Sequence, residues 1–147
     1  MKLSAKTRYG LAALLRLSLT QAGDERLTAA RIAADLGLSK LYLEQSFSLL
    51  KRAGLLEAEK GALGGYRLAR SPGAIDLRTV LAALEPDLFA PTETTVPEQA
   101  PSFERAWEDV LYRPLQDAAN RFLASVTLAD AAESVRRIGA DGYMYYL

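Results

Sequence analysis

The sequence predicts a mainly α-helical protein with one small β-hairpin. Three observations lead to this fold class. Apolar residues recur at helical spacing through most of the chain, a glycine-rich stretch at 61–65 lies between two short segments of strand character, and four prolines separate two helical regions within 86–102. The chain has 147 residues, which allows one domain with an oligomerisation segment but not two large cores.

The first helix is predicted by a cap and an apolar stripe. The Ser4 side chain can accept a hydrogen bond from the first turn, and Gly23 with Asp24 would end the helix. Apolar side chains recur along this helix at i, i+3, i+4 and i+8, which predicts one core-facing stripe. The residues of this stripe are Leu11, Leu14, Leu15 and Leu19.

Two shorter helices follow and are joined by a tight turn. Thr28 can cap the second helix, and Gly37 can end it in the left-handed conformation. Ser39 can cap the third helix, which Gly54 closes. The core-facing residues of the third helix are Leu43, Phe47 and Leu50. Two short helices joined by a glycine turn predict a helix-turn-helix.

The apolar period changes from helix to strand after Leu55. Residues 56–59 and 66–68 are predicted strands, and the glycines within 61–65 permit the backbone torsions of a hairpin between them. The same loop is not a phosphate-binding P-loop, because it lacks the Gly-Lys-Ser/Thr ending and precedes a strand rather than a helix. The sequence therefore predicts a wing directly after the helix-turn-helix.

A helix capped by Asp76 leads into a proline-rich linker or loop at 86–102. A long apolar helical face follows the linker. Its residues are Leu115, Ala119, Phe122, Leu123 and Val126. Pro114 lies within this stretch, so the helix is expected to begin there or to bend there. Thr127 and Asp130 resemble a capping box for a last helix.

The composition excludes several classes of function. The chain contains no cysteine and no histidine, which removes thiol nucleophiles, Ser-His triads, disulfides, iron–sulfur ligation and nearly every zinc site. No cluster of acids favours a hard-cation site and no side-chain pair is set up for catalysis, so neither a cofactor nor an enzyme is predicted. Arg16 interrupts the one apolar run well before the ~20 residues of a membrane span, and no signal peptide is visible. A cytoplasmic protein without a membrane partner is expected.

The charges are unevenly distributed, although the formal net charge is zero. Residues 1–85 contain 13 Lys and Arg against 8 Asp and Glu, a net +5, and residues 86–147 contain 5 against 10, a net −5. This asymmetry is typical of a chain in which one part meets a polyanion and the other does not. A charge difference of this size also arises by chance on helical surfaces. Charge alone therefore does not decide whether the chain binds a polyanion.

A winged helix-turn-helix binds duplex DNA in a characteristic way. Its second helix enters the major groove, and the hairpin reaches phosphates or the minor groove. The side chains opposite the core stripe of the third helix are Leu41, Gln45, Ser48 and Arg52. Gln45 can bond adenine in two places, Glu44 can accept from a cytosine amino group, and Leu41 can pack against a thymine methyl. Lys60 beside Gly61 places a cation at the wing tip.

Alternative interpretations exist for some of these features. Glu44 lies four residues after Lys40 and can form only a surface ion pair with it. Tyr42 can lean on the core. The net neutrality, Leu41 and an aromatic tail also fit a protein-interaction module that controls an enzyme and has lost DNA binding.

Four short motifs carry a resemblance to a known family. They are KLSAKTRYG at 2–10, YLEQ at 42–45, RAGL at 52–55 and GGYRL at 64–68. In combination they resemble the IscR/NsrR-type winged-helix transcription regulators of bacteria. The resemblance spans most of residues 1–85 and continues more weakly through 122–128.

The resemblance implies a homodimer, formed by packing of the long C-terminal helices, that binds a pseudo-palindromic operator in double-stranded DNA. Tyr42, Glu44 and Gln45 match the recognition-helix contacts of the family, and Lys60 with Gly61 matches its wing tip, where Arg is usual. The full set of predicted DNA-contacting residues is Thr28, Ser39, Lys40, Leu41, Tyr42, Glu44, Gln45, Lys60 and Gly61.

The predicted organisation has a DNA-binding domain at 1–85, the linker or loop at 86–102, and a dimerisation helix with a C-terminal tail at 103–147. An effector or partner that acts on residues 86–147 is expected to change the spacing of the two DNA-binding units in the dimer.

The chain also departs from the family pattern. Leu41 occupies a position at which family members can make a polar contact with a base. The base that this position contacts is therefore not determined by the resemblance. The three-cysteine cluster site expected near 90–110 is absent, which excludes an iron–sulfur sensor on ligand chemistry. With no histidine, the usual proton switch near neutral pH is also missing.

Part of the family lacks the cluster, and the repressors of cysteine metabolism are its best-described members. Their aromatic tails dock into cysteine synthase. The predicted partner-binding residues here, similar in kind, are Tyr143, Met144, Tyr145, Tyr146 and Leu147. Alternatively, this tail folds back on its own dimer and buries its rings.

Overall fold

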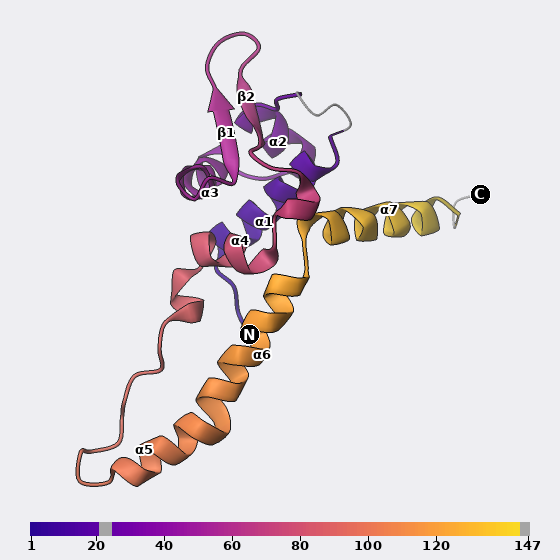
Figure 1. The fold of residues 1–147 in the computed structure, drawn as a ribbon. Coiled ribbons are helices and arrows are strands. Elements are labelled where there is room, and N and C mark those ends of the chain that lie inside the picture. The colour runs from indigo at the N-terminus through magenta and orange to yellow at the C-terminus, as the bar shows by residue number, and fades with distance from the viewer. Residues whose placement is uncertain (21–24, 145–147) are drawn as a thin grey trace.

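The computed structural model describes residues 1–20 and 25–144 and confirms the predicted fold class, a mainly helical protein with a two-stranded antiparallel hairpin (Figure 1). Its α-helices are α1 (Ala5–Ser18), α2 (Ala29–Leu36), α3 (Lys40–Arg52), α4 (Leu77–Leu84), α5 (Pro101–Trp107), α6 (Arg113–Ser125) and α7 (Leu128–Met144). The strands are β1 (Leu56–Glu59) and β2 (Gly65–Leu68). The short elements are the 3-10 turns η1 (Pro72–Ala74) and η2 (Pro86–Phe89) and the π-helical turn η3 (Glu108–Tyr112).

Helix α1 lies at the centre of the N-terminal core. Its fully buried residues are Thr7, Gly10, Ala13, Leu14, Leu17 and Ser18. The predicted stripe is confirmed for Leu14, which is buried, and for Leu11, which packs against the core while partly exposed, whereas Leu15 and Leu19 are only partly buried and lie outside the core cluster. Small residues share the core face with Leu14 and Leu17, because a neighbouring helix approaches α1 closely at Gly10. A Cβ atom on Gly10 would lie 2.7 Å from a methyl carbon of Leu84 in α4.

The ends of the first three helices follow the predicted capping chemistry in part. The Thr28 hydroxyl accepts a backbone N–H three residues on at 3.1 Å, and Gly37 ends α2 with a φ of 66°. Ser39 has the backbone torsions of an N-cap, but its side chain makes no capping hydrogen bond, contrary to the prediction. Helix α1 ends at Ser18, earlier than the predicted stop at Gly23.

The wing is tied to the segment that precedes α2. Leu56 pairs with Leu68 and Glu59 with Gly65 across the hairpin. Tyr66 also exchanges two backbone hydrogen bonds with Leu27, at 3.0 and 2.7 Å. Only glycine fits at position 65, because its φ is 132° and a Cβ there would lie 2.7 Å from the Leu27 carbonyl group. The wing and the start of α2 are therefore held together through the backbone.

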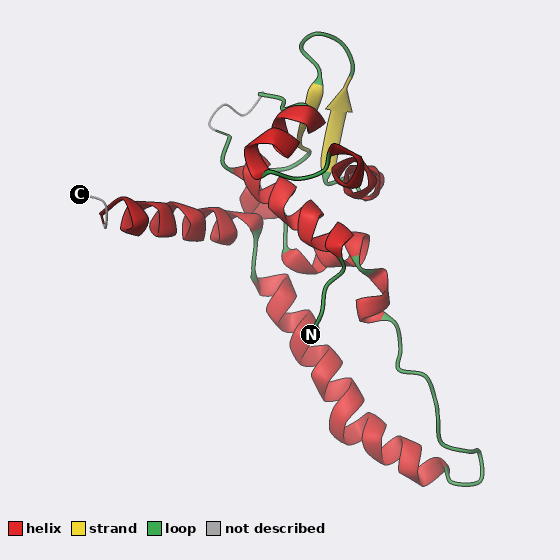
Figure 2. Cartoon of the chain, turned by 180° about the vertical axis from the view of Figure 1, so that it is seen from behind, coloured by secondary structure: helices red, strands yellow, loops and turns green. Residues whose placement is uncertain are grey.

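Helices α5 and α6, joined by the π-helical turn η3, form one rod that leads away from the N-terminal core (Figures 1 and 2). The predicted linker at 86–102 is not extended throughout, because η2 occupies its start and the rod begins at Pro101. Helix α6 begins at Arg113 with Pro114 in its first turn, as predicted, but through η3 it continues the rod rather than starting it. Pro114 directly follows η3, and a π-helical turn accommodates the missing N–H and the ring of a proline within a helix.

After the rod, the chain returns to the N-terminal core. The Leu77 N–H donates to the Val126 carbonyl at 2.8 Å, and the Leu128 N–H donates to the Ile75 carbonyl at 3.0 Å. Leu128 and Ala132 of α7 are buried, and Leu128 belongs to the main hydrophobic cluster. Helix α7 then projects away in a direction different from that of the rod (Figures 1 and 2).

The predicted capping box starts α7. Thr127 N–H donates to the Asp130 carboxylate at 2.8 Å, and Asp130 N–H donates to the Thr127 hydroxyl at 3.3 Å. Over the described residues, no helix is both long enough and apolar enough to cross a lipid bilayer.

Candidate nucleic-acid interface

Helix α3 presents one polar face to solvent and one apolar face to the core. The buried residues on its core face are Leu43, Ser46, Phe47 and Leu50. On the opposite side, the side chains of Leu41 and Tyr42 are 64% and 53% exposed, and Gln45 and Arg52 are exposed as well. The helix therefore projects a row of side chains outward along its length, as a recognition helix must.

The N-terminal part of α1 holds α3 in place. The hydroxyl of Ser46, which is fully buried, donates to the Lys6 carbonyl oxygen at 2.7 Å. The Tyr9 ring meets the Tyr42 ring edge to face, with centroids 6.0 Å apart. Sequence reasoning missed Ser46, although its position next to Leu50 on the helical wheel, at the edge of the core stripe, could have placed it inside.

Helix α1 is in turn fixed to the end of α4 by Glu85. The Glu85 carboxylate accepts the Thr7 hydroxyl at 2.7 Å and the Ser4 N–H at 2.9 Å. The hydrogen bond from Thr7, followed by those from Ser4, holds the pKa of the Glu85 carboxyl below its ordinary value. The N-terminal end of α1, which contacts α3 through the Lys6 carbonyl, is thus also fixed to the end of α4.

The first turn of α3 carries an ion pair. Lys40 Nζ lies 3.7 Å from Glu44 Oε1, so the surface pair considered from the sequence is present. Both side chains remain about half exposed, which leaves them free to exchange partners. Glu44, Leu41 and Gln45 also line a shallow hollow on the outer face of α3, together with Lys6 from α1.

The wing tip lies at the far end of the hairpin. Lys60 and Gly61 are exposed, and Gly61 has a φ of 103°, a conformation that favours glycine. A Cβ on Gly64 would collide with the Glu59 carbonyl oxygen, so the turn also requires glycine there. Thr28 directly follows Leu27, the residue that pairs with the wing, and its hydroxyl is engaged as the α2 cap.

Arg26, a residue that sequence reasoning missed, lies against the wing. Its Nη1 is 3.4 Å from Glu59 Oε2, and Arg67 pairs with Glu57 across the hairpin at 2.8 Å. Nothing in the local sequence signals the first of these pairs, because Arg26 and Glu59 are distant along the chain.

The predicted tail residues fall at the edge of the described structure. The backbone of α7 extends through Met144, and the side chains of Tyr143 and Met144 lie outside the described part. Tyr145, Tyr146 and Leu147 lie wholly outside the described residues. Their predicted role in partner binding therefore stays a prediction.

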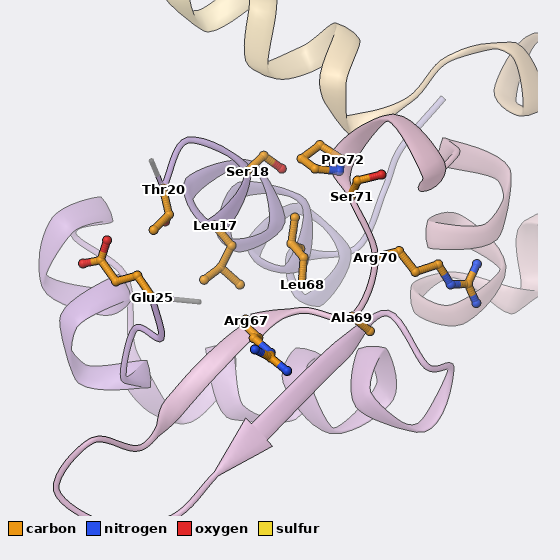
Figure 3. A pocket seen from close by; sticks show the side chains of 10 residues that line it. All are labelled: Leu17, Ser18, Thr20, Glu25, Arg67, Leu68, Ala69, Arg70, Ser71 and Pro72. Atoms are coloured by element: carbon orange, nitrogen blue, oxygen red, sulfur yellow. The ribbon is translucent and has the colours of Figure 1, made fainter. Parts of the chain in front are cut away.

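A hollow of about 400 Å³ lies between the C-terminal end of α1 and the base of the wing (Figure 3). The Thr20 hydroxyl at this hollow is buried without a hydrogen-bond partner. The charged side chains around it do not converge: Arg67 is paired with Glu57, and Arg70 points away (Figure 3). The arrangement does not form a built site for a charged ligand.

The described part of the chain forms no cluster of metal-ligating side chains. It contains no cysteine or histidine at all. Among residues 1–20 and 25–144, no group of three or more acidic side chains is arranged to hold a metal ion.

Comparison with known proteins gives the family. A family model described as "Rrf2: Iron-dependent Transcriptional regulator" matches residues 3–134. The HTH-type transcriptional regulator CymR of Bacillus subtilis is 35% identical over 147 residues, which is all of both chains. The HTH-type transcriptional regulator IscR of Erwinia tasmaniensis is 34% identical over 130 residues, 88% of this chain and 78% of the relative.

Solved structures of similar proteins show the same fold. The structure of B. subtilis CymR, titled the global cysteine regulator of that organism, has a TM-score of 0.71 and 33% identity over 91% of this chain and 98% of its own. T. potens IscR has a TM-score of 0.71 and 32% identity over 99% and 97%. These relatives are transcriptional regulators rather than enzymes, and the resemblance inferred from the motifs is confirmed. The chain belongs to the Rrf2 family, as a CymR-like DNA-binding transcriptional regulator with a winged-helix fold.

Proposed function

We propose that the protein binds a pseudo-palindromic DNA operator as a homodimer, with one α3 helix in the major groove of each half-site. The observation that carries this proposal is the exposed row of α3 side chains beside a protruding wing. Leu41 and Tyr42 are adjacent and exposed on this face, and a groove of bases would cover both.

The roles of the interface residues follow from their chemistry. Gln45 bonds an adenine edge, Glu44 accepts from a cytosine amino group once it leaves Lys40, and Leu41 covers a thymine methyl. Lys60 contacts a phosphate, and Gly61 allows the backbone to approach the strand. The remaining residues of the predicted DNA-contacting set lie at the start of α2 or in the first turn of α3. They are Thr28, Ser39, Lys40 and Tyr42.

The second protomer covers the rod formed by α5 and α6. The large apolar side chains exposed along this rod include Phe103, Trp107, Leu111, Leu115 and Phe122. Phe103 and Phe122 are 68% and 64% exposed, which is costly for a helix that faces only water.

The π-helical turn helps to align this stripe. Steps of four residues drift by roughly 40° each around an ideal α-helix, so Phe103, Trp107, Leu111 and Leu115 would not share one face of a regular helix. One wider turn at η3 corrects the drift and brings the upstream residues toward the face of Leu115. A continuous apolar face of this kind fits a second copy of the same rod.

The iron named in the family description does not fit the residues of this chain. An iron–sulfur cluster in this family needs thiolate ligands, and the chain has none and no histidine to replace them. We therefore propose a regulator that works without a cluster, and no step of its mechanism passes through iron.

The working division of the chain is DNA binding at 1–85, a connecting loop at 86–102, and dimerisation at 103–147. The two outer parts are packed together, because Leu128 and Ala132 lie in the core and α6 contacts α4 through Arg78. A signal acting on 86–147 would therefore change the spacing of the two α3 helices by moving the rod against α4.

A second candidate function is control of a metabolic enzyme such as cysteine synthase. The feature that favours it is the aromatic segment 143–147. The measurement is binding of purified cysteine synthase to the full chain and to a variant lacking these five residues. Equal binding by both, or none by either, removes the tail from this role.

The proposed DNA binding is tested by the affinity for the protein's own promoter region as salt is raised. A steep fall of log K against log salt is expected, because phosphate contacts release counterions. A flat plot would remove the proposal. Selection of bound sequences from a random DNA pool, repeated with candidate metabolites, then gives the half-sites and the signal.

A further inference from the structure

The charges of the wing are arranged around its tip. The hairpin carries two acids on β1, Glu57 and Glu59, and two bases, Lys60 and Arg67. Glu57 is paired with Arg67 at 2.8 Å. Lys60 makes no ion pair within the described residues. Glu59, directly beside Lys60, therefore decides whether the tip presents a net cation to DNA.

Glu59 forms its ion pair with Arg26, which lies outside the hairpin. Arg26 Nη1 lies 3.4 Å from Glu59 Oε2, and the Arg26 side chain is only 17% exposed while that of Glu59 is 63% exposed. The backbone pairing of Leu27 with Tyr66 fixes the segment that carries Arg26 against the wing. Arg26 is thus anchored, and Glu59 is drawn toward it.

On the basis of the proposed DNA binding, we propose that Arg26 is a positioning residue of the wing: it holds and neutralises Glu59 and leaves Lys60 as the effective charge at the tip. Arg26 acts through Glu59 and does not itself touch DNA. Its Nε atom is buried without a hydrogen-bond partner among the described residues, and its Nη1 pairs with the Glu59 carboxylate.

The physical reason lies in the short distance between Glu59 and Lys60. Adjacent Cα atoms are about 3.8 Å apart, so the two side-chain charges stay within a distance comparable to the Debye length of roughly 8 Å at physiological salt. An unpaired Glu59 carboxylate would therefore repel any phosphate that Lys60 approaches, and it would compete with that phosphate for the Lys60 ammonium. Pairing with Arg26 removes both effects.

The test is a double-mutant cycle on operator affinity with Arg26→Ala, Glu59→Gln and the double variant. Arg26→Ala should weaken binding by about 10-fold at low salt, because Glu59 then faces the phosphates unpaired. Glu59→Gln alone should change affinity by less than about 3-fold, and the double variant should return to within about 3-fold of the wild type. Arg26→Lys should retain most of the affinity.

Two outcomes would overturn the proposal. If the double variant binds as weakly as Arg26→Ala, then Arg26 contacts DNA directly. If Glu59→Gln improves affinity equally in both backgrounds, then the two charges act independently. The matched control is Arg136→Ala, which breaks an exposed Arg–Glu pair on α7. Wild-type protein that binds no DNA at any salt would refute the proposed function itself, and thermal unfolding of each variant identifies a folding defect.

Discussion

The N-terminal core and the rod use apolar side chains in opposite ways. In the core, large apolar side chains of α1, α3 and α4 are fully buried by the same chain, with Phe47, Leu14 and Leu84 nearly inaccessible. Along α5 and α6, residues of the same kind, such as Trp107 and Leu115, remain more than half exposed. The core is therefore complete within one protomer, and the rod is not.

This difference separates two kinds of stability in one molecule. Removing apolar side chains from the core should unfold the protein, whereas changing those of the rod should leave each protomer folded and break only its association. The rod touches the core through few polar contacts, such as Arg78 Nε donating to Asn120 Oδ1 at 3.0 Å. Variants on the rod therefore report on assembly rather than on folding.

The largest effect is expected for Leu115→Glu. A charge at the centre of the exposed stripe should give a monomer, and loss of the second half-site contact should lower operator affinity by at least about 100-fold. The measurement is sedimentation combined with DNA titration. Ala124→Glu is the matched control, because Ala124 is exposed on the same helix and nine residues on, on the opposite side from Leu115. Equal behaviour of the two variants would contradict an interface on this stripe.

Cysteine cross-linking tests how the two rods are oriented in the proposed dimer. The chain has no cysteine, so an introduced thiol is unique. The exposed apolar stripe runs from Phe103 to Phe122, its midpoint lies within one helical turn of Leu115, and an antiparallel partner would place Leu115 near its own symmetry mate. Leu115→Cys should then form a disulfide-linked dimer, and Trp107→Cys should not. Cross-linking of both to the same extent would indicate parallel rods.

A smaller effect is expected within the DNA interface. Gln45→Ala should cost roughly 1–3 kcal/mol at one base pair and relax selectivity there. Lys60→Ala should weaken binding to all sequences more evenly and reduce the salt dependence, because it removes a phosphate contact. Titration of an operator and of single-base variants measures both. If the two substitutions act alike, the division between specifying and positioning residues is wrong.

The helix-turn-helix and wing were predictable because their signals are local. Caps such as Thr28, the left-handed glycine at Gly37 and the period change after Leu55 each act within a few residues. The buried stripe of α1 was only partly predictable from large apolar residues, because Gly10 and Ala13 share it with Leu14 and Leu17. Gly10 faces the core only because α4 passes so close to it.

The parts of the site that sequence reasoning missed depend on contacts between distant residues. Arg26 meets Glu59, and Ser46 meets the Lys6 carbonyl, over separations that no local pattern encodes. The π-helical turn before Pro114 was also unexpected, since a proline more often starts or kinks a helix. The exposed row of α3, by contrast, followed directly from the position of its core stripe.

The smallest effect is expected for substitution of Glu85, whose carboxylate joins α4 to the start of α1. Its carboxyl has a pKa below the ordinary 4.5, chiefly because of the Thr7 hydroxyl. A lowered pKa in the folded state means that the ionised group stabilises the fold above the unfolded pKa, and that this contribution is lost as pH falls through the folded pKa. Glu85→Gln should therefore be less stable than the wild type at pH 7, with the difference shrinking as pH falls below about 4.5.

Chemical denaturation of both proteins across pH 3 to 7 measures this difference. Glu93→Gln is the control, because Glu93 is exposed in the loop that precedes the rod. A difference between Glu85→Gln and the wild type that stays constant with pH would show that the substitution acts through packing and not through the charge. Operator affinity at pH 7 should fall only slightly, since Glu85 reaches α3 indirectly, through α1 and the Lys6 carbonyl that the Ser46 hydroxyl holds.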